Sequence, residues 1–578
     1  MKTKKLLSLL VLTASVSGLI ACGGNDKESS SSSSSSNAVS TPSVPSASSS
    51  SIPSGPKLNG VYHNENNVGY QLLVYSFNDS DGDGRGDIKG ITQKLDYFVD
   101  LGVNVLWLSP INKAGSYHGY DVQDYYSINS RLGSEADLKE LIEEAHKKDI
   151  KILLDMVVNH TSNSHPWFID ARRNPESKYR NYYIQKQAGV TYGTSTNSSA
   201  AWHMQGDFNY YSSFTSSMPD LNLGNPEVMA EVKNIFNYWV DFGVDGFRLD
   251  AIKHFFDPAE YATGTNVKEM TANCFNEINL AMKEKNPNIF FVGEWLDEGG
   301  FTSYKTSAPY IDSQFSFYSR KMLIDTASGS KSAMGLATKI TTEINELTAL
   351  NPDFTYTPII SNHDHDRIAS TYGFFDSKLK LRLINSMLLT LPGMPFVYSG
   401  DELGMTGDRY NNDDIERRLP FKWGEGNEVN PDTYGRGKYD PSELTKRTSV
   451  VEAKADVLSL YNLHKDILAV RKATKAYAGG KMSVFGDDSN SDVMAFFIEA
   501  NGQKLLIAHN VKNRAKELNL NGVKIEKNLF TSYNVDQWGK DFEKDSEGNY
   551  TLSKANTYTI SGDVMTLAPF STVIFEVK

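Results

Sequence analysis

Cysteine is scarce in this sequence. Its 578 residues include only Cys22 and Cys274, so a disulfide framework is excluded. Basic charge is in deficit as well, because 70 Asp and Glu outnumber 58 Lys and Arg, and no basic block lies beyond the first five residues. We therefore do not expect nucleic acid as a partner. A glycine-rich nucleotide fingerprint is also missing from the starts of the expected helices, which disfavours an open nucleotide-binding sheet.

The N-terminal part of the chain differs in composition from the rest. A lysine-rich start precedes an apolar run over residues 6–21, which is too short to span a bilayer and is typical of an export signal. The run ends in Leu-Ile-Ala-Cys22, which resembles the lipobox of bacterial lipoproteins and implies acylation of Cys22. We expect a signal peptide over residues 1–21 and a serine-rich tether over residues 22–58. The protein would be exported and lipid-anchored at the bacterial cell surface.

The middle of the chain alternates expected strands and helices. The apolar run over residues 102–110 ends in proline and is typical of a parallel strand covered on both faces. Helical patterns occupy 135–148 and 228–242. We expect further strands at 150–158, 244–249, 289–292, 357–360 and 395–398. This rhythm predicts a closed (β/α)₈ barrel over 59–159 and 226–475, with an open doubly wound sheet as the alternative.

Two segments break the barrel pattern. Residues 160–225 are rich in Tyr, Trp, Ser and Asn and are too long for an ordinary connection between a strand and a helix. We expect an inserted small domain, called domain B below, over the barrel mouth after the third strand. From about residue 476 to residue 578 short alternating strands predict a C-terminal β-sandwich.

Acidic residues follow several expected strands. Asp250, Glu294 and Asp364 each stand at the end of such a strand, and Arg248 lies two residues before Asp250 on the same strand face. The carboxyl ends of barrel strands carry the chemistry of this fold, so we expect these side chains to converge. A cluster of carboxylates suits cleavage of a glycosidic bond, which needs an acid for the leaving oxygen and a carboxylate for the developing cation.

The surroundings of these acids predict different ionisation. Asp250 beside Arg248 is expected to stay ionised and act as the nucleophile. Glu294 is crowded by other carboxylates, so we expect its pKa to be raised and the residue to act as the acid.

The strand-end motifs together resemble the α-amylase family, glycoside hydrolase family 13. They include Gly102–Pro110, Asp155–His160, Met218–Asn222, Gly246–His254 and Gly393–Glu402, in the family's order. The resemblance implies Asp250 as nucleophile, Glu294 as acid and base, and Asp364 as transition-state stabiliser. It implies substrate contacts or positioning roles for Tyr120, His160, Arg248, Lys253, His254 and His363.

The resemblance implies an α-amylase that cuts internal α-1,4 bonds of starch or maltooligosaccharides. Lys253-His254 is amylase-like, and Tyr117-His118 replaces the loop acid of oligo-1,6-glucosidases, which favours an open cleft. Met218–Asn222 is intermediate between subgroups, so neopullulanase, oligo-1,6-glucosidase or transglycosylase activity stays open. A glycan-binding lipoprotein without activity is a further alternative, which the complete acidic set disfavours. We expect a monomer whose partner is an α-glucan.

Two calcium sites are expected. Asp79-Ser-Asp81-Gly-Asp83-Gly-Arg85-Gly-Asp87 spaces acids as a Ca²⁺-binding loop does, although Gly90 replaces the final Glu of an EF-hand. The loop resembles that of many family members, with Asp79, Asp81, Asp83 and Asp87 as side-chain ligands and Arg85 binding through its carbonyl. Resemblance to amylases implies a second Ca²⁺ held by Asn159, Asp220 and the His254 carbonyl.

Overall fold

The computed structural model describes residues 62–195, 197–375, 377–426, 428–486, 492–532 and 557–578. Its largest sheet has eight strands, and the neighbouring strands run parallel. In sheet order they are β11 (Thr355–Pro358), β10 (Ser313–Ser316), β9 (Phe290–Gly293), β8 (Gly246–Leu249), β5 (Lys151–Met156), β2 (Val105–Leu108), β1 (Gly69–Leu72) and β12 (Phe396–Tyr398).

The two ends of this sheet meet, so it forms a nearly closed barrel. The backbone N–H of Met394, just before β12, donates to the carbonyl of Tyr356 in β11 at 2.8 Å. Gly393 permits this approach, since its φ is +77° and a Cβ there would lie 2.1 Å from the Tyr356 carbonyl oxygen. The predicted (β/α)₈ barrel is confirmed, and the open-sheet alternative is wrong.

Successive side chains of each barrel strand point alternately into the barrel and toward the surrounding helices, so the core has two apolar layers. In β2, Val105 and Trp107 join the aromatic and aliphatic cluster inside the barrel, together with Phe290 and Phe315. Leu106 and Leu108 of the same strand belong to the core between the strands and the helices. Both faces of the strand are therefore apolar, which explains the nearly continuous apolar run in the sequence.

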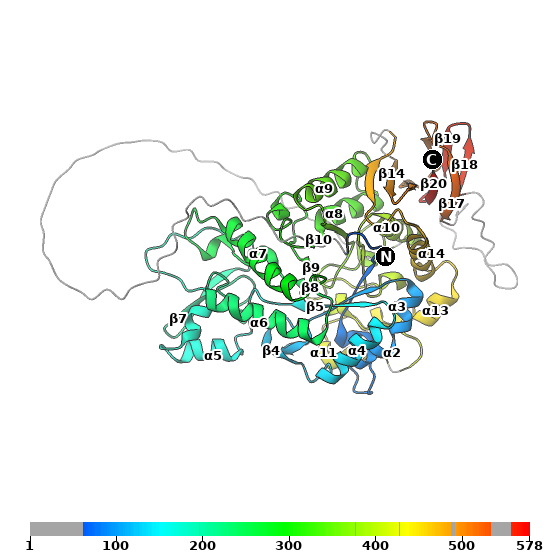
Figure 1. Ribbon diagram of the computed structural model, residues 1–578. Coiled ribbons are helices and arrows are strands. Elements are labelled where there is room, and N and C mark those ends of the chain that lie inside the picture. The colour runs from blue at the N-terminus through cyan, green and yellow to red at the C-terminus, as the bar shows by residue number, and fades with distance from the viewer. Residues whose placement is uncertain (1–61, 196, 376, 427, 487–491, 533–556) are drawn as a thin grey trace, which may run out of the picture. The chain divides into compact units, whose positions relative to one another are not determined.

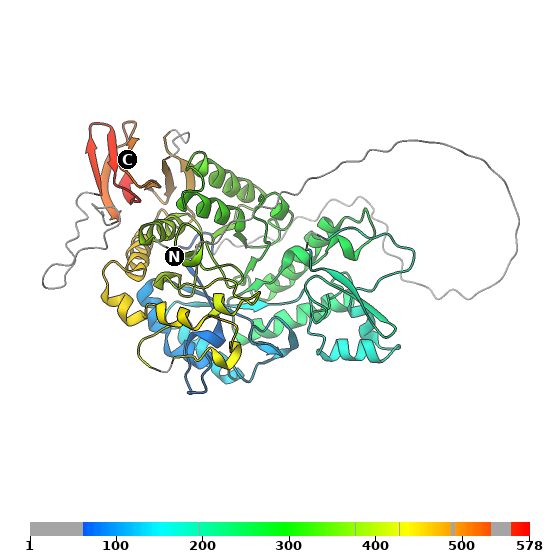
Figure 2. The ribbon, with the colours of Figure 1, turned by 180° about the vertical axis from the view of Figure 1, so that it is seen from behind.

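Helices cover the outside of the barrel. Figure 1 shows α6 and α7 beside each other next to β8 and β9, and Figure 2 shows the molecule from behind. Local signals set their ends: α6 begins after the N-cap Asn225 with proline in its first turn and ends at Gly243, whose φ is +99°. Among the described residues outside domain B, the α-helices are α1 (Val74–Phe77), α2 (Ile88–Gln93), α3 (Leu95–Leu101), α4 (Glu135–His146), α6 (Pro226–Phe242), α7 (Val267–Lys285), α8 (Phe317–Ala327), α9 (Leu336–Leu350), α10 (Lys378–Thr390), α11 (Asp432–Gly435), α12 (Pro441–Lys446), α13 (Val450–Ala455) and α14 (Leu460–Ala473).

Long connections follow β2 and β5. The connection after β2 forms a hairpin of β3 (Asn112–Ala114) and β4 (Val122–Ile128). The connection after β5 holds α5 (Pro166–Arg173) and a hairpin of β6 (Ala201–Gln205) and β7 (Phe208–Ser212), within the predicted domain B. Its return segment is tied to the end of β5, because the Leu221 N–H donates to the Asn159 carbonyl at 2.9 Å.

The C-terminal part of the chain is rich in antiparallel strands. One sheet has the order β13 (Lys481–Val484), β14 (Val493–Ala500), β15 (Gln503–Asn510), β20 (Thr572–Val577) and β17 (Ile525–Thr531), and another has β16 (Lys516–Asn519), β19 (Val564–Leu567) and β18 (Tyr558–Ser561). A separate apolar cluster including Leu506, Met565 and Phe575 draws on both sheets. This arrangement agrees with the predicted C-terminal β-sandwich.

Several predictions concern the N-terminal region. The signal peptide, the tether and the acylated Cys22 lie outside the described residues, and the domain boundaries stay predictions. Among the helices that the structure describes, none combines the length and the apolar character needed to cross a membrane.

Candidate active site

A cavity of about 430 Å³ opens at the carboxyl ends of the barrel strands. It is lined by Asp250 after β8, Glu294 after β9 and Asp364 after β11, so three acids distant in sequence share one hollow. Tyr120 and His160 also line it. The barrel places them together because its parallel strands all end at this mouth.

Arg248 in β8 connects two of these acids, Asp250 and Glu294. It is fully buried, and its Nη1 contacts Asp250 Oδ1 at 2.7 Å while its Nη2 contacts Glu294 Oε2 at 2.8 Å. The same Nη1 contacts Asp155 Oδ1 at 2.8 Å. Its guanidinium also lies 4.8 Å from the Trp107 ring centroid. One cation therefore serves three buried carboxylates, and we expect this group to retain at least one proton near neutral pH.

The pKa shift of Glu294 agrees with the sequence-based expectation, and that of Asp250 differs from it. Burial raises the pKa of Glu294, as predicted, although Arg248 acts to lower it. Burial also raises the pKa of Asp250 well above its ordinary value, and the charge of Glu294 adds to this rise against Arg248. The sequence-based expectation for Asp250 counted the arginine and omitted desolvation. Since the two carboxyls share Arg248 and lie side by side, their titrations are linked.

The pKa of Asp364 is shifted in the opposite direction, downward. Partial desolvation by the surrounding side chains would raise the pKa of its carboxyl, but His363, Arg418 and Arg248 together lower it well below the ordinary value. Arg418 Nη2 contacts Asp364 Oδ1 at 2.8 Å, and Arg418 Nε donates to the His363 carbonyl at 3.0 Å. Asp364 is therefore ionised while Glu294 can hold a proton.

A hydrogen-bonded chain supports this carboxylate from below. Gln71 in β1 donates a hydrogen bond from Nε2 to His363 Nδ1 at 2.6 Å. The ring proton of His363 is therefore on Nε2, which can donate to the Tyr120 hydroxyl or to the Asp364 carboxylate. Burial lowers the pKa of His363 to about 3, so its ring is neutral. Tyr120 stacks on His363 with ring centroids 5.3 Å apart and donates to Asp155 at 3.0 Å. The chain fixes the ring positions beside the cavity.

Domain B supplies an apolar wall. Phe214 and Met218 line the cavity, and the Phe214 ring lies between those of His160 and His254, with centroids 5.4 and 5.3 Å away. Burial lowers the pKa of His160 to about 4, and its Nε2 donates to the Tyr120 carbonyl at 3.1 Å. The Phe214 ring is thus held by histidines from two strand ends.

Lys253 and His254, which were predicted to contact the substrate, are not among the residues that line the cavity. Lys253 Nζ donates to the Leu296 carbonyl at 3.3 Å, and His254 Nδ1 lies 3.4 Å from Asp257 Oδ2. Two tyrosines of domain B, Tyr183 and Tyr211, are each 1% exposed and pack inside that domain. Phe214 was missed because no spacing in the sequence distinguishes it from its aromatic neighbours.

Sequence reasoning also missed Gln71, Asp155 and Arg418. Asp155 was noticed at a strand end but given no role, although it accepts hydrogen bonds from Trp107, Tyr120 and Arg248. Arg418 is separated from Asp364 by 54 residues and comes from η7 (Ile415–Arg418), so only the folded chain reveals the contact.

Comparison with known proteins connects this geometry to a family. Residues 71–480, more than half of the chain, match the alpha amylase catalytic domain. The chain belongs to the α-amylase family. It is therefore a member of glycoside hydrolase family 13, whose barrel and acidic mouth the structure displays.

Relatives within the α-amylase family have different names. Alpha-amylase 3 of Dictyoglomus thermophilum is 36% identical over 469 residues, which are 80% of this chain and 88% of that protein. A 4-alpha-glucanotransferase of Thermotoga maritima is 35% identical over 372 residues, which are 64% of this chain and 78% of that protein. The crystal structure of alpha-amylase from H. orenii has a TM-score of 0.72 and 32% identity, and covers 88% of this chain and 99% of that one.

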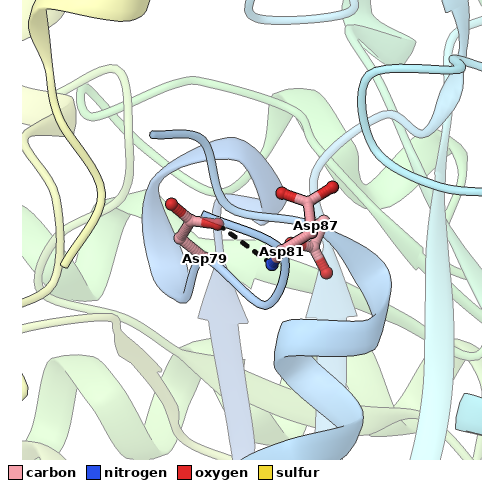
Figure 3. A group of neighbouring side chains, drawn as sticks. All are labelled: Asp79, Asp81 and Asp87. Atoms are coloured by element: carbon pink, nitrogen blue, oxygen red, sulfur yellow. Dashed lines mark hydrogen bonds between the residues drawn. The ribbon is translucent and has the colours of Figure 1, made fainter. Parts of the chain in front are cut away.

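The acidic loop between α1 and α2 has the composition of a calcium site. In this α-amylase family member, carboxylate oxygens of Asp79, Asp81 and Asp87 lie within 4.8 Å of one another. Figure 3 shows the three side chains on this loop, with the hydrogen bond between Asp79 and the Asp81 backbone N–H. Oxygen-only donors of this charge fit Ca²⁺. Asp83 lies outside the group and forms an ion pair with Arg85 at 3.0 Å.

The second predicted calcium set is partly engaged with protein donors. Both carboxylate oxygens of Asp220 accept hydrogen bonds from Ser213, whose hydroxyl donates at 2.6 Å. The Asn159 amide Nδ2 lies 3.3 Å from His160 Nδ1. In the described part of the chain, residues 79, 81 and 87 are the only group of three or more Asp, Glu, His or Cys whose ligand atoms all lie within 4.8 Å of one another. The second site stays a prediction.

Proposed function

We propose that this protein is an α-amylase that hydrolyses internal α-1,4-glucosidic bonds of starch and maltooligosaccharides with retention of anomeric configuration. The observation that carries the proposal is the shared cavity of Asp250, Glu294 and Asp364, with Arg248 contacting two of them. One guanidinium keeps Asp250 and Glu294 close together, and retaining enzymes need their two carboxyls roughly 5 Å apart. The 36% identity to an alpha-amylase supports the substrate class.

The first chemical step uses Asp250 and Glu294 in different ionisation states. The linked Asp250–Glu294 pair retains a proton, and Glu294 delivers it to the glycosidic oxygen as the bond to the anomeric carbon breaks. Asp250, held by Arg248 at 2.7 Å, attacks that carbon and forms a glycosyl ester. The ionised Asp364 stabilises the positive charge that develops on the sugar ring.

The second step reverses these roles. Glu294, now deprotonated, removes a proton from a water molecule, which attacks the anomeric carbon and releases Asp250. Two inversions at one carbon give net retention. The Ala251 N–H donates to Glu294 Oε2 at 3.1 Å and keeps this carboxyl oriented in both steps.

Transfer to a sugar is the second candidate function. The same glycosyl ester transfers to a sugar hydroxyl if that acceptor replaces water, and a relative 35% identical is named 4-alpha-glucanotransferase. The cavity wall formed by Phe214 and Met218 offers an apolar surface to an acceptor ring. Neopullulanase and oligo-1,6-glucosidase activities use the same acids and stay as alternatives for linkage.

Product analysis on three substrates separates these activities. Amylose, pullulan and cyclodextrin are incubated with the purified enzyme, and the products are resolved by chromatography over time. An internal-cutting amylase gives a ladder of maltooligosaccharides from amylose and leaves pullulan largely intact. Panose from pullulan would indicate a neopullulanase, and products longer than a maltooligosaccharide substrate would indicate a transferase.

Calcium and a membrane anchor complete the proposal. Ca²⁺ at Asp79, Asp81 and Asp87 would be held by carboxylate oxygens and would brace the connection after β1. Acylation of Cys22 would hold the enzyme at the bacterial cell surface, where polymeric substrate is met. Metabolic labelling of the full-length chain with a tagged fatty acid, compared with Cys22→Ala, tests the anchor.

A further inference from the structure

The acidic loop of residues 79–87, called the calcium loop below, is joined to a segment distant in the sequence. The Gly84 carbonyl accepts the Asn430 N–H at 2.9 Å and the Thr433 hydroxyl at 3.2 Å. The Gly84 N–H donates to Asp79 Oδ2 at 2.8 Å. The approach is close, because a Cβ at Gly84 would lie 3.0 Å from Thr433 Cγ2. Gly84 therefore connects a predicted calcium ligand to the distant segment.

Tyr434, the residue after Thr433, belongs to a cluster of three tyrosines. Its ring stacks on that of Tyr117 with centroids 5.7 Å apart, and it meets the Tyr75 ring edge to face at 5.0 Å. The Tyr75 and Tyr117 rings also pack edge to face, with centroids 5.1 Å apart. The calcium loop reaches this tyrosine cluster a second time, because the Gly86 N–H donates to the Tyr75 carbonyl at 2.8 Å.

The tyrosine cluster also contacts Arg418. The Tyr117 hydroxyl accepts a hydrogen bond from Arg418 Nη1 at 3.0 Å, and the Tyr434 hydroxyl donates to the Arg418 carbonyl at 3.4 Å. Arg418 Nη2 in turn contacts Asp364 Oδ1 at 2.8 Å. Contacts between neighbouring groups therefore continue from the calcium loop to a carboxylate of the cavity.

The packing of the tyrosine cluster suits it to transmit the state of the loop. The carboxylates of Asp79, Asp81 and Asp87 repel one another, and Ca²⁺ bound between them would offset this repulsion and fix the loop. The tyrosine cluster belongs to the hydrophobic core, where Tyr75 is 4% exposed. A densely packed interior transmits small displacements, because a ring that shifts must displace its neighbours.

We propose that Tyr434 is a positioning residue, which transmits the state of the calcium loop to Arg418 and, through Arg418, to Asp364. Tyr434 is not among the residues that line the cavity, so its effect on the reaction is indirect. The assignment rests on the proposed function and deepens it, because it gives the calcium loop an effect on the chemical step as well as on stability.

A double-mutant cycle tests this connection. Asp79→Asn weakens the calcium site, and Tyr434→Leu removes the ring that contacts Tyr75 and Tyr117. We measure kcat and KM on maltopentaose at one calcium concentration that saturates the wild type, at a temperature where circular dichroism shows every variant folded. Loss of an aromatic pair corresponds to about a fivefold change, so each single variant should lower kcat by about fivefold with KM unchanged. The double variant should also lose about fivefold rather than about 25-fold, because both changes act through one connection.

Calorimetric titration with calcium chloride gives a readout that does not depend on turnover. Coupling between two sites is reciprocal, so Tyr434→Leu should weaken calcium binding by about fivefold. Tyr434→Phe keeps the ring contacts and should retain the wild-type kcat and calcium affinity. Tyr372→Leu is the matched control, because Tyr372 is 82% exposed, and it should leave both quantities unchanged.

Several results would overturn the assignment. They are losses in kcat that multiply in the double variant, a rise in KM at constant kcat, and a calcium affinity of Tyr434→Leu equal to that of the wild type. Absence of calcium binding by the wild type would overturn it as well. A wild-type enzyme that binds calcium but hydrolyses neither maltopentaose nor amylose would overturn the proposed function, and calorimetry would still decide whether Tyr434 is coupled to the calcium loop.

Discussion

Arg418 is expected to position Asp364, and replacing it with methionine tests this. The guanidinium is buried and makes three hydrogen bonds, to the Asp364 carboxylate at 2.8 Å, the His363 carbonyl at 3.0 Å and the Tyr117 hydroxyl at 3.0 Å, and an ion pair with Asp414 at 3.7 Å. Methionine is unbranched and uncharged and replaces the aliphatic part of the arginine, so Arg418→Met removes these contacts and keeps the apolar packing of the stem. The barrel strands themselves are untouched.

The expected loss follows from the Arg418–Asp364 contact. A hydrogen bond between charged groups contributes about 1.5 to 3 kcal/mol. The Asp364 side chain is 41% exposed, so water replaces part of the contact and the loss lies near the lower end of this range. A loss of about 2 kcal/mol corresponds to about a thirtyfold fall in kcat/KM.

The pH profile distinguishes positioning of Asp364 from a general loss of structure. Arg418 is one of the groups that lower the pKa of Asp364, and its removal lets that pKa rise. Asp364 must be ionised to stabilise the transition state. As the pH is lowered, Arg418→Met should therefore lose activity at a higher pH than the wild type does. The assay is kcat/KM for maltooligosaccharide hydrolysis between about pH 4 and pH 8.

A control and a contrary result complete the test. Arg436→Met changes an exposed arginine whose side chain is 82% exposed and should leave the profile unchanged. If Arg418→Met keeps wild-type kcat/KM and the same acid limb, Arg418 does not position Asp364. A parallel loss at every pH without a shifted limb would contradict the electrostatic part of the reasoning.

Three further predictions concern other groups. Glu294→Gln should abolish hydrolysis and leave maltooligosaccharide binding by calorimetry largely intact, and wild-type turnover would contradict its role as the acid. Asp79→Asn should lower the thermal midpoint in calcium and remove its sensitivity to a chelator; an unchanged chelator response would reject the loop as the site. Burial raises the pKa of Glu402 to about 7, so this carboxyl contributes less stability as the pH rises through about 7. The stability of Glu402→Gln relative to wild type should therefore improve from about pH 5 to pH 8 in thermal unfolding, and a constant difference would refute this.

The strands that sequence analysis found were those with continuous apolar runs. β2 and β5 bury both faces and were predicted close to their observed bounds. β1 and β10 were missed because their sequences, GYQL and SQFS, contain buried polar residues. Gln71 in β1 is polar for a functional reason, since it contacts His363 at 2.6 Å. Polar residues that support the site thus hid the strands that carry them.

The acids of the site were predictable because the barrel brings all strand ends to one mouth. Their ionisation was less predictable, since burial of Asp250 depends on side chains from several strands. Arg418 and Phe214 come from connections between strands, whose paths follow from tertiary packing rather than from local pattern. Sequence therefore predicted the carboxylates and missed the groups that orient them and line the cavity.

The anomeric configuration of the first product tests the central claim most directly. Proton magnetic resonance during hydrolysis of maltopentaose resolves the α and β anomers of the new reducing end before they interconvert. Double displacement through Asp250 and Glu294 predicts that the α anomer appears first and that the β anomer follows by mutarotation. Initial appearance of the β anomer, or no hydrolysis of maltopentaose, would contradict the account.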